Sequence, residues 1–203
     1  MRDIIYNRLS TLESEGLGYI QTSELLKKGF TNRQIALLTD EEFLERVTYG
    51  IYWIPSDRYD KPDHYKAIEV IMSDPEAVIC ADSACYYHGI IEEEPLTLAV
   101  ATKRSDRRKL DMQFPTTRYY VSDSIFDQGI DTVETDYGQI RIYNAARSVC
   151  DCFKYKNKID QNSFEQIKAR FDDETDVAMI NMKKRILAYA KAFRVCMSGK
   201  TDL

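Results

Sequence analysis

The fold of the N-terminal part of the chain is best predicted from the stretch Thr22-Ser23-Glu24-Leu25-Leu26-Lys27-Lys28-Gly29-Phe30-Thr31-Asn32-Arg33-Gln34-Ile35. Thr22 is a good N-cap for a helix that carries two leucines, and Gly29 suits the left-handed residue that ends such a helix. Thr31 with Gln34 three residues later has the spacing of a capping box, which predicts a second helix. Two helices joined by a short glycine-containing turn are typical of a helix-turn-helix.

Elements on both sides of this stretch complete a winged helix. Apolar residues at helical spacing predict a helix over residues 2–14, and Tyr19-Ile20 is a short extended piece. Downstream, residues 43–47 and 51–54 read as two short strands around Gly50, which predicts a hairpin. We therefore predict an N-terminal winged helix-turn-helix domain over residues 1–56.

The rest of the chain is predicted to form a second domain over residues 62–203. Two prolines bracket the polar stretch from Pro55 to Pro62, which marks the boundary. Beyond it we expect a mixed α/β domain with a helical C-terminal part, so the fold class is α+β. The expected elements are a short helix at 82–88 with Asp82 as its N-cap, strands at 96–101, 118–121, 131–135 and 139–143, and three helices, of which the first is capped by Asn144 and the last covers 179–195.

The start of the second helix of the pair carries candidate DNA-binding residues. In a helix-turn-helix the N-terminal residues of this helix meet base edges in the major groove, and here they are Thr31, Asn32, Arg33 and Gln34. Arg suits guanine, whereas Asn and Gln suit adenine. The alternative is a helix cap followed by a solvated face.

The predicted wing offers Arg46 and Tyr49 for phosphate contact. Arg46 could equally pair with Glu42 or Glu45.

The charge of the chain argues against nonspecific wrapping of nucleic acid. The 203 residues include 28 Lys and Arg against 33 Asp and Glu, a formal net charge of −5. A DNA-binding domain normally concentrates positive charge, because phosphate neutralisation supplies much of the affinity. Dimerisation on DNA, or help from basic residues elsewhere, would therefore be needed. The densest such group is an auxiliary basic patch made of Lys103, Arg104, Arg107, Arg108 and Lys109, for which the alternative is a solvated loop.

No catalytic or metal-binding constellation is apparent. Asp82, Ser83 and His88 have the residue types of a hydrolase triad, but a helix would rotate Ser83 and His88 away from each other. The five cysteines and two histidines lack the paired spacing of a structural zinc site. We therefore predict no enzymatic activity, no metal and no cofactor.

The sequence favours a cytoplasmic protein without a membrane partner. Its longest apolar stretches are far shorter than the roughly 20 residues that cross a bilayer, and no signal peptide is visible. The odd number of cysteines does not suggest a disulfide framework, so most of the thiols are expected to be small buried hydrophobic groups.

Four segments in this order carry a resemblance to a known family. They are the helix-turn-helix stretch 19–29, the wing segment 43–52 with its Leu-Glu-Arg and Gly-Ile-Tyr, the segment Ser83-Ala84-Cys85-Tyr86-Tyr87-His88-Gly89-Ile90, and the segment Asn144-Ala145-Ala146-Arg147-Ser148-Val149-Cys150-Asp151. Together they resemble the AbiEi family of antitoxins from type IV toxin–antitoxin and abortive-infection systems. The resemblance covers residues 1 to about 155, and Tyr49 stands where many members have a basic residue.

The resemblance implies a function. An AbiEi-like protein would repress its own promoter through the winged helix and would neutralise a cognate nucleotidyltransferase-like toxin, in defence against phage. The alternatives are a stand-alone winged-helix transcriptional regulator and a protein-interaction module in host defence that does not bind DNA.

Overall fold

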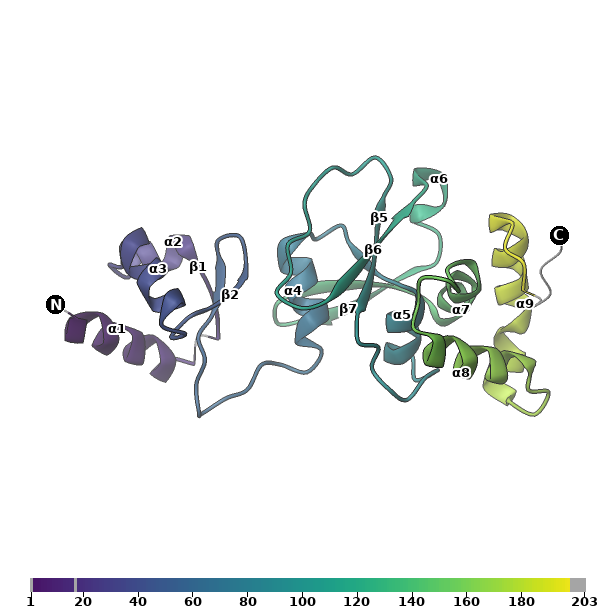
Figure 1. The fold of residues 1–203 in the computed structure, drawn as a ribbon, viewed down its shortest axis with the longest axis horizontal. Coiled ribbons are helices and arrows are strands. Elements are labelled where there is room, and N and C mark those ends of the chain that lie inside the picture. The colour runs from purple at the N-terminus through teal and green to yellow at the C-terminus, as the bar shows by residue number, and fades with distance from the viewer. Residues whose placement is uncertain (1, 17, 198–203) are drawn as a thin grey trace. The chain divides into compact units, whose positions relative to one another are not determined.

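The computed structural model describes residues 2–16 and 18–197 and divides the chain into two compact units (Figure 1). The first unit contains the residues up to Ser73 together with Lys109–Gln113, and the second contains Asp74–Arg108 and the residues from Phe114 onward. The first unit thus runs past the boundary that the prolines suggest. Both units mix helices with a β-sheet, as expected for an α+β chain.

The first unit begins with the elements that the sequence predicts. In chain order they are α1 (Arg2–Ser14), β1 (Tyr19–Gln21), α2 (Thr22–Lys27), α3 (Asn32–Asp40), β2 (Glu45–Thr48) and β3 (Ile51–Trp53). The three strands form an antiparallel sheet in the order β1-β3-β2. Apolar side chains from all three helices meet in one core, which includes Leu9, Leu25 and Leu38.

Two glycines shape this first unit. Gly29 has a φ of +87°, the left-handed conformation predicted for the residue that ends α2. Gly18 lies directly against Trp53, and a Cβ at that position would stand 2.3 Å from the indole ring. Residues with a side chain are therefore excluded at position 18 unless Trp53 moves.

Helix α4 (Tyr65–Ser73) also belongs to the first unit and was not predicted. It buries Glu69 along with its apolar residues, and Glu69 accepts hydrogen bonds from Lys61 Nζ at 2.8 Å and from the Tyr19 hydroxyl at 3.0 Å. Burial raises the pKa of the Glu69 carboxyl, and the hydrogen bond from Lys61 opposes that rise. The polar stretch before Pro62 thus supplies the cation that makes burial of Glu69 tolerable.

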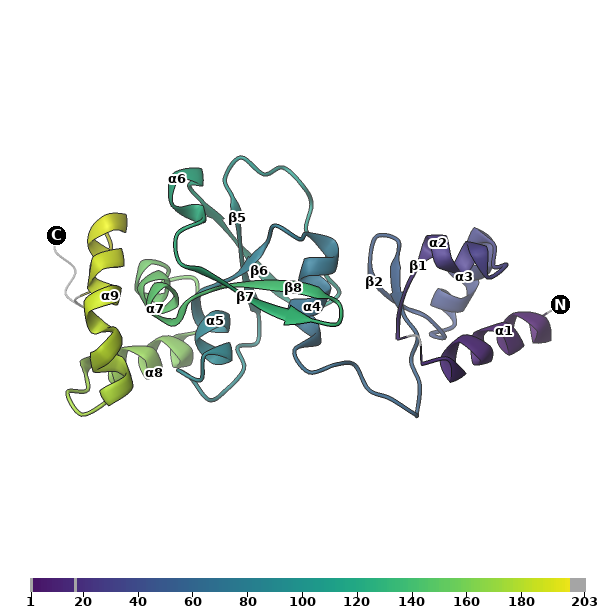
Figure 2. The same ribbon diagram turned by 180° about the vertical axis from the view of Figure 1, so that it is seen from behind.

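The second unit is a five-stranded mixed sheet with helices. Its elements are β4 (Val78–Ile79), α5 (Ala81–Tyr87), β5 (Leu98–Lys103), β6 (Thr116–Val121), α6 (Asp123–Phe126), β7 (Ile130–Thr135), β8 (Gly138–Tyr143), α7 (Ala145–Lys154), α8 (Gln161–Asp172) and α9 (Val177–Phe193). The strand order is β6-β5-β4-β8-β7, with β5 parallel to β6 and β4 parallel to β8. Figure 2 shows α5, α7, α8 and α9 on the same side of this sheet, with α7 between α5 and α9.

Helix caps are predicted correctly in two cases and wrongly in two. Thr31 caps α3 and Asn144 caps α7, each by accepting a hydrogen bond from the third residue of its helix. Thr22 instead lies inside α2, whose N-cap is Gln21. Asp82 lies inside the first turn of α5, whose N-cap is Cys80. In both wrong predictions the helix begins one or two residues earlier than the strongest local capping residue suggests.

The core of the second unit surrounds a buried arginine. Arg147 in α7 is fully buried, and its Nε donates to Asp151 Oδ2 at 2.9 Å. Its Nη1 donates to the carbonyl oxygens of Ile125 and Gln128, at 3.1 Å each. The guanidinium also lies between two aromatic rings, 4.3 Å from the centroid of Tyr143 and 4.1 Å from that of Phe193. One side chain therefore connects α6, the end of β8, α7 and α9.

We predict that Arg147→Ala lowers the free energy of unfolding by about 3–5 kcal/mol, because it leaves the Asp151 carboxylate buried and without its partner. Urea denaturation followed by circular dichroism measures this change. The control is Arg185→Ala on the exposed side of α9, which is expected to change stability by less than about 0.5 kcal/mol. Equal stability of the two variants would contradict the structural role assigned to Arg147.

Candidate nucleic-acid interface

A tight turn between α2 and α3 presents the start of α3 at the surface of the first unit. The Phe30 amide donates to the carbonyl of Leu25 at 3.1 Å, and the Phe30 ring is buried in the core. The turn is therefore held both by backbone hydrogen bonding and by packing. It leaves Thr31, Asn32 and Arg33 exposed.

The capping box at the start of α3 is formed and engages two of the predicted DNA-binding side chains. The backbone amide of Gln34 donates to Thr31 Oγ1 at 3.3 Å, and the backbone amide of Thr31 donates to Gln34 Oε1 at 2.8 Å. Within residues 2–16 and 18–197, Asn32 and Arg33 form no side-chain hydrogen bond or ion pair. Asn32 and Arg33 are therefore the two of the four that remain available to a ligand.

The β2–β3 hairpin is fixed to the start of α2. The Gly50 carbonyl accepts hydrogen bonds from the Thr22 amide at 2.8 Å and from the Thr22 hydroxyl at 3.2 Å. Gly50 has a φ of +76° at the bend, and the neighbouring Tyr49 side chain is 89% exposed. Thr22 thus holds the hairpin through hydrogen bonds and does not cap helix α2.

The predicted wing arginine has a partner that the sequence did not suggest. Arg46 Nη2 lies 3.6 Å from Asp111 Oδ2, in the segment Lys109–Gln113 of the first unit. Glu45, one of its two predicted partners, instead pairs with Lys61 at 2.5 Å. Arg46 remains about half exposed, so this pair is weak and leaves the guanidinium accessible.

Most other cations near the helix pair are engaged. Lys28 pairs with Glu15 at 2.6 Å, and Arg8 donates to the carbonyl of Gly29 at 2.7 Å. Lys27, in the last turn of α2, is exposed and has no ion pair within the described part of the chain. Lys27 was not predicted as a candidate DNA-binding residue, although its position two residues before Gly29 could have indicated it. Lys27 and Arg33 are the uncommitted cations of the α2–α3 pair.

Several residues of the predicted auxiliary basic patch already pair with carboxylates of the protein. Lys103, at the end of β5, lies 3.7 Å from Asp127, and Lys109 lies 3.9 Å from Asp111. Arg108 contacts Asp74 at 2.8 Å and binds Asp106 through two hydrogen bonds of 3.1 Å each. Arg104 and Arg107 are exposed and form no ion pair among the residues that the structure describes. Three cations of the patch therefore pair within the protein, and Arg104 and Arg107 are the two that an external anion can reach.

The hydrogen bonds from Arg108 hold the pKa of the Asp106 carboxyl below its ordinary value. Asp74, the other partner of Arg108, is buried. The guanidinium therefore neutralises two carboxylates, one in its own loop after β5 and one in the segment before β4. This makes Arg108 a stabilising residue of the loop.

The residue types of a hydrolase triad are not assembled. Ser83 Oγ accepts a hydrogen bond from the Ala99 amide at 2.8 Å, whereas His88 Nε2 lies 2.8 Å from the Tyr143 carbonyl oxygen. Each side chain thus contacts a different strand.

Four of the five cysteines are buried, as expected, and Cys196 is exposed. The described residues contain no group of three His, Cys, Asp or Glu side chains that could hold a metal ion.

A scan against protein-family models and a search of curated proteins found no match to this chain. Across the described residues, none of the helices is long and apolar enough to cross a membrane.

We predict that Arg108→Gln lowers the free energy of unfolding by about 1 kcal/mol, whereas Arg104→Gln changes it by less than about 0.5 kcal/mol. The difference arises because Arg108 pairs with two carboxylates and Arg104 with none that the structure describes. Urea denaturation of the two variants at neutral pH measures both changes. Equal losses would mean that the ion pairs of Arg108 do not stabilise the loop.

The effect of Arg108→Gln should also depend on pH. Since the pKa of Asp106 is lowered in the folded state, its stabilisation is present above the unfolded pKa of about 3.9 and is lost as the pH falls through the lower folded pKa. The gap in unfolding free energy between wild type and Arg108→Gln should therefore shrink below about pH 4. A gap that stays constant from pH 7 into this range would contradict the assignment.

Proposed function

We propose that the first six elements of the chain form a winged helix-turn-helix that binds promoter DNA, and that the protein is an antitoxin of the AbiEi type. In this proposal it represses its own operon and neutralises a cognate nucleotidyltransferase-like toxin. The observation that carries the DNA-binding part is the capped start of α3, where Asn32 and Arg33 are exposed and uncommitted. The toxin-neutralising part rests on the sequence resemblance.

The chemistry of these two side chains suits direct readout of bases. A guanidinium can donate two hydrogen bonds to the O6 and N7 atoms of guanine, and an amide can pair with the N6 and N7 atoms of adenine. The capping box holds the α3 backbone, so both side chains project from a fixed helix end. Tyr49, exposed beside Gly50, offers a hydroxyl for a phosphate oxygen.

The electrostatics imply that such binding would be only modestly sensitive to salt. With Arg33 assigned to a base, the cations available for phosphate contact are Lys27 in α2 and the accessible Arg46 of the hairpin, and each phosphate contact contributes about −0.9 to the slope of log affinity against log salt. Two contacts in one protomer give a slope of about −2, and a dimer gives about −4. Dimerisation would thus supply affinity that one acidic protomer lacks.

A second candidate function, a protein-interaction module without DNA binding, is favoured by exposed apolar side chains on the first unit. Ile4 is 56% exposed, Leu26 44%, Leu37 37% and Phe43 45%. Apolar side chains of this size at a surface can anchor a protein partner. Under this alternative the toxin would still be neutralised, but promoter DNA would not be bound with sequence preference.

We predict that Arg33→Ala weakens binding to the DNA upstream of the gene by about 5–150-fold, the cost of one lost bidentate base contact. Fluorescence anisotropy with the upstream duplex and with a scrambled duplex measures the change. The matched control is Arg58→Ala, an exposed arginine of the same unit outside the helix pair, which should retain full preference for the upstream duplex.

Three outcomes of these measurements are informative. Wild-type protein that binds both duplexes equally would contradict the repressor proposal and favour the protein-interaction module. If Arg33→Ala loses DNA binding yet still protects cells that express the downstream toxin, repression and neutralisation depend on different residues, as proposed. Loss of protection by both Arg33→Ala and Arg58→Ala would instead point to a common folding defect.

A further inference from the structure

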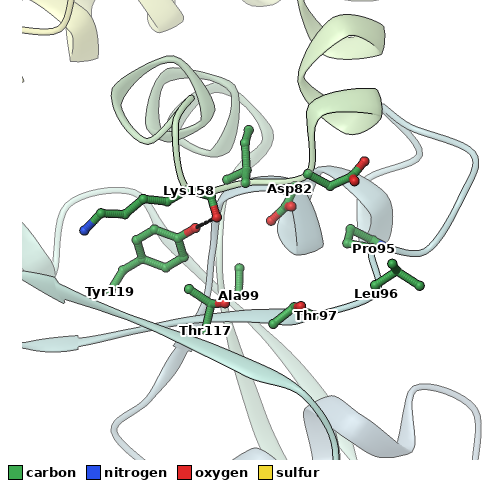
Figure 3. A pocket seen from close by; sticks show the side chains of 10 residues that line it. Asp82, Pro95, Leu96, Thr97, Ala99, Thr117, Tyr119 and Lys158 are labelled. Carbon is green, nitrogen blue, oxygen red and sulfur yellow. Dashed lines mark hydrogen bonds between the residues drawn. The ribbon is translucent and has the colours of Figure 1, made fainter.

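A cavity of about 200 Å³ opens in the second unit. It is lined by the start of α5, by residues of β5 and β6, and by the segment that precedes α8. Figure 3 shows Asp82 directing its carboxylate into this space from above, with Thr97 and Thr117 on the opposite side. Since one water molecule occupies about 30 Å³, the cavity has room for a small organic group.

Asp82 is a buried carboxylate at the wall of this cavity. Only 4% of the residue is exposed, and Oδ1 accepts a hydrogen bond from the Ser83 amide at 3.0 Å. Burial raises the pKa of Asp82, and the backbone amides of Ser83 and Asp160 oppose the rise. No Lys or Arg side chain of the described residues forms an ion pair with it. A buried carboxylate is normally paired with a cation, so this one lacks its usual complement.

The one lysine that lines the cavity does not supply that cation. Figure 3 shows the Lys158 side chain running away from Asp82, past the ring of Tyr119, with its ammonium group at the far end. The Lys158 carbonyl, in contrast, faces the cavity and accepts a hydrogen bond from the Tyr119 hydroxyl at 3.3 Å. The cavity is therefore lined by acceptor oxygens and by two carboxylate residues, the buried Asp82 and the exposed Asp160, while the ammonium group of its one lysine points away from Asp82.

An exposed apolar side chain lines the cavity, and three acidic residues lie just before it in the sequence. Leu96 lines the cavity and is 87% exposed, which is unusual for so large an apolar side chain. The three residues before Pro95 are Glu92, Glu93 and Glu94, all exposed. A ligand that carries a positive charge on an alkyl chain would match both features.

We propose that this cavity binds a primary alkylammonium group, with the Asp82 carboxylate as its counter-ion and Leu96 against its alkyl chain. An ammonium group has three donors, and the hydroxyls of Thr97 and Thr117 supply acceptors besides Asp82. A guanidinium fits less well, because its paired donors prefer two free carboxylate oxygens and Oδ1 already accepts from Ser83. The group belongs either to a free small amine or to a lysine side chain of a partner protein.

The direct test is a titration of the ¹⁵N-labelled full-length protein with n-butylammonium, followed by amide chemical shifts. We expect saturable shifts of the Ser83, Thr97 and Asp160 amides at millimolar concentrations. The neutral isostere n-butanol should bind at least about tenfold more weakly, because it lacks the charge that Asp82 complements. Equal binding of the two compounds, or the absence of saturable shifts with n-butylammonium, would overturn the proposal.

A third compound distinguishes the two sources of the ammonium group. If Nα-acetyl-lysine methylamide binds as tightly as n-butylammonium, the cavity accepts a lysine side chain with its backbone attached. If n-butylammonium binds and the lysine derivative does not, the ligand is a free amine. Both results support an ammonium site.

Two variants test the residues while controlling for folding. Asp82→Asn keeps an oxygen for the Ser83 amide and removes the buried charge, so it should lose the preference for n-butylammonium over n-butanol without a lower melting temperature. Thr117→Leu should fill the cavity and abolish binding, whereas Thr132→Leu on the exposed face of β7 should bind as wild type does. Wild-type binding by Thr117→Leu, with its fold intact, would contradict the site.

Discussion

The second unit depends on one buried guanidinium. Arg147 has no exposed surface, and its charge is compensated by Asp151, by the Ile125 and Gln128 carbonyls and by the aromatic faces of Tyr143 and Phe193. These groups come from four different elements, so the charge can be buried only when all four are in place. Such an arrangement specifies one packing of α7 against α9 and the sheet, because any other would leave the charge uncompensated.

Local signals in the sequence predicted local structure well. The capping box at Thr31, the cap at Asn144 and the left-handed Gly29 depend on residues within four positions of one another, and the structure contains all three. Helix α4 and strand β4 were missed, since α4 buries Glu69 by means of Lys61 and Tyr19, and β4 has only two residues. Arg147 and Asp151 have the spacing of a helical ion pair, but their burial depends on α9, which lies some 40 residues downstream.

At the candidate interface, too, the sequence predicted local features but not contacts between residues that are distant in the chain. Residue type and position predicted Asn32 and Arg33 at the start of α3, but not which cations are free to meet an external anion. That depends on tertiary partners such as Asp111 for Arg46 and Asp74 for Arg108. A count of charges in the sequence therefore overestimates the positive charge that is free to bind a ligand, and the first unit retains few uncommitted cations at its helix pair. Base recognition, more than bulk electrostatic attraction, would then account for any selectivity for DNA.

The proposed DNA-binding function requires the start of α3 to contact bases. Two-dimensional NMR of the arginine Nε–Hε groups in the full-length protein, with the upstream duplex and a scrambled duplex added in turn, tests it most directly. We expect the Arg33 resonance to shift with the upstream duplex and to stay in place with the scrambled one. An Arg33 resonance that does not respond to either duplex, while those of Arg104 and Arg107 respond to both, would contradict it.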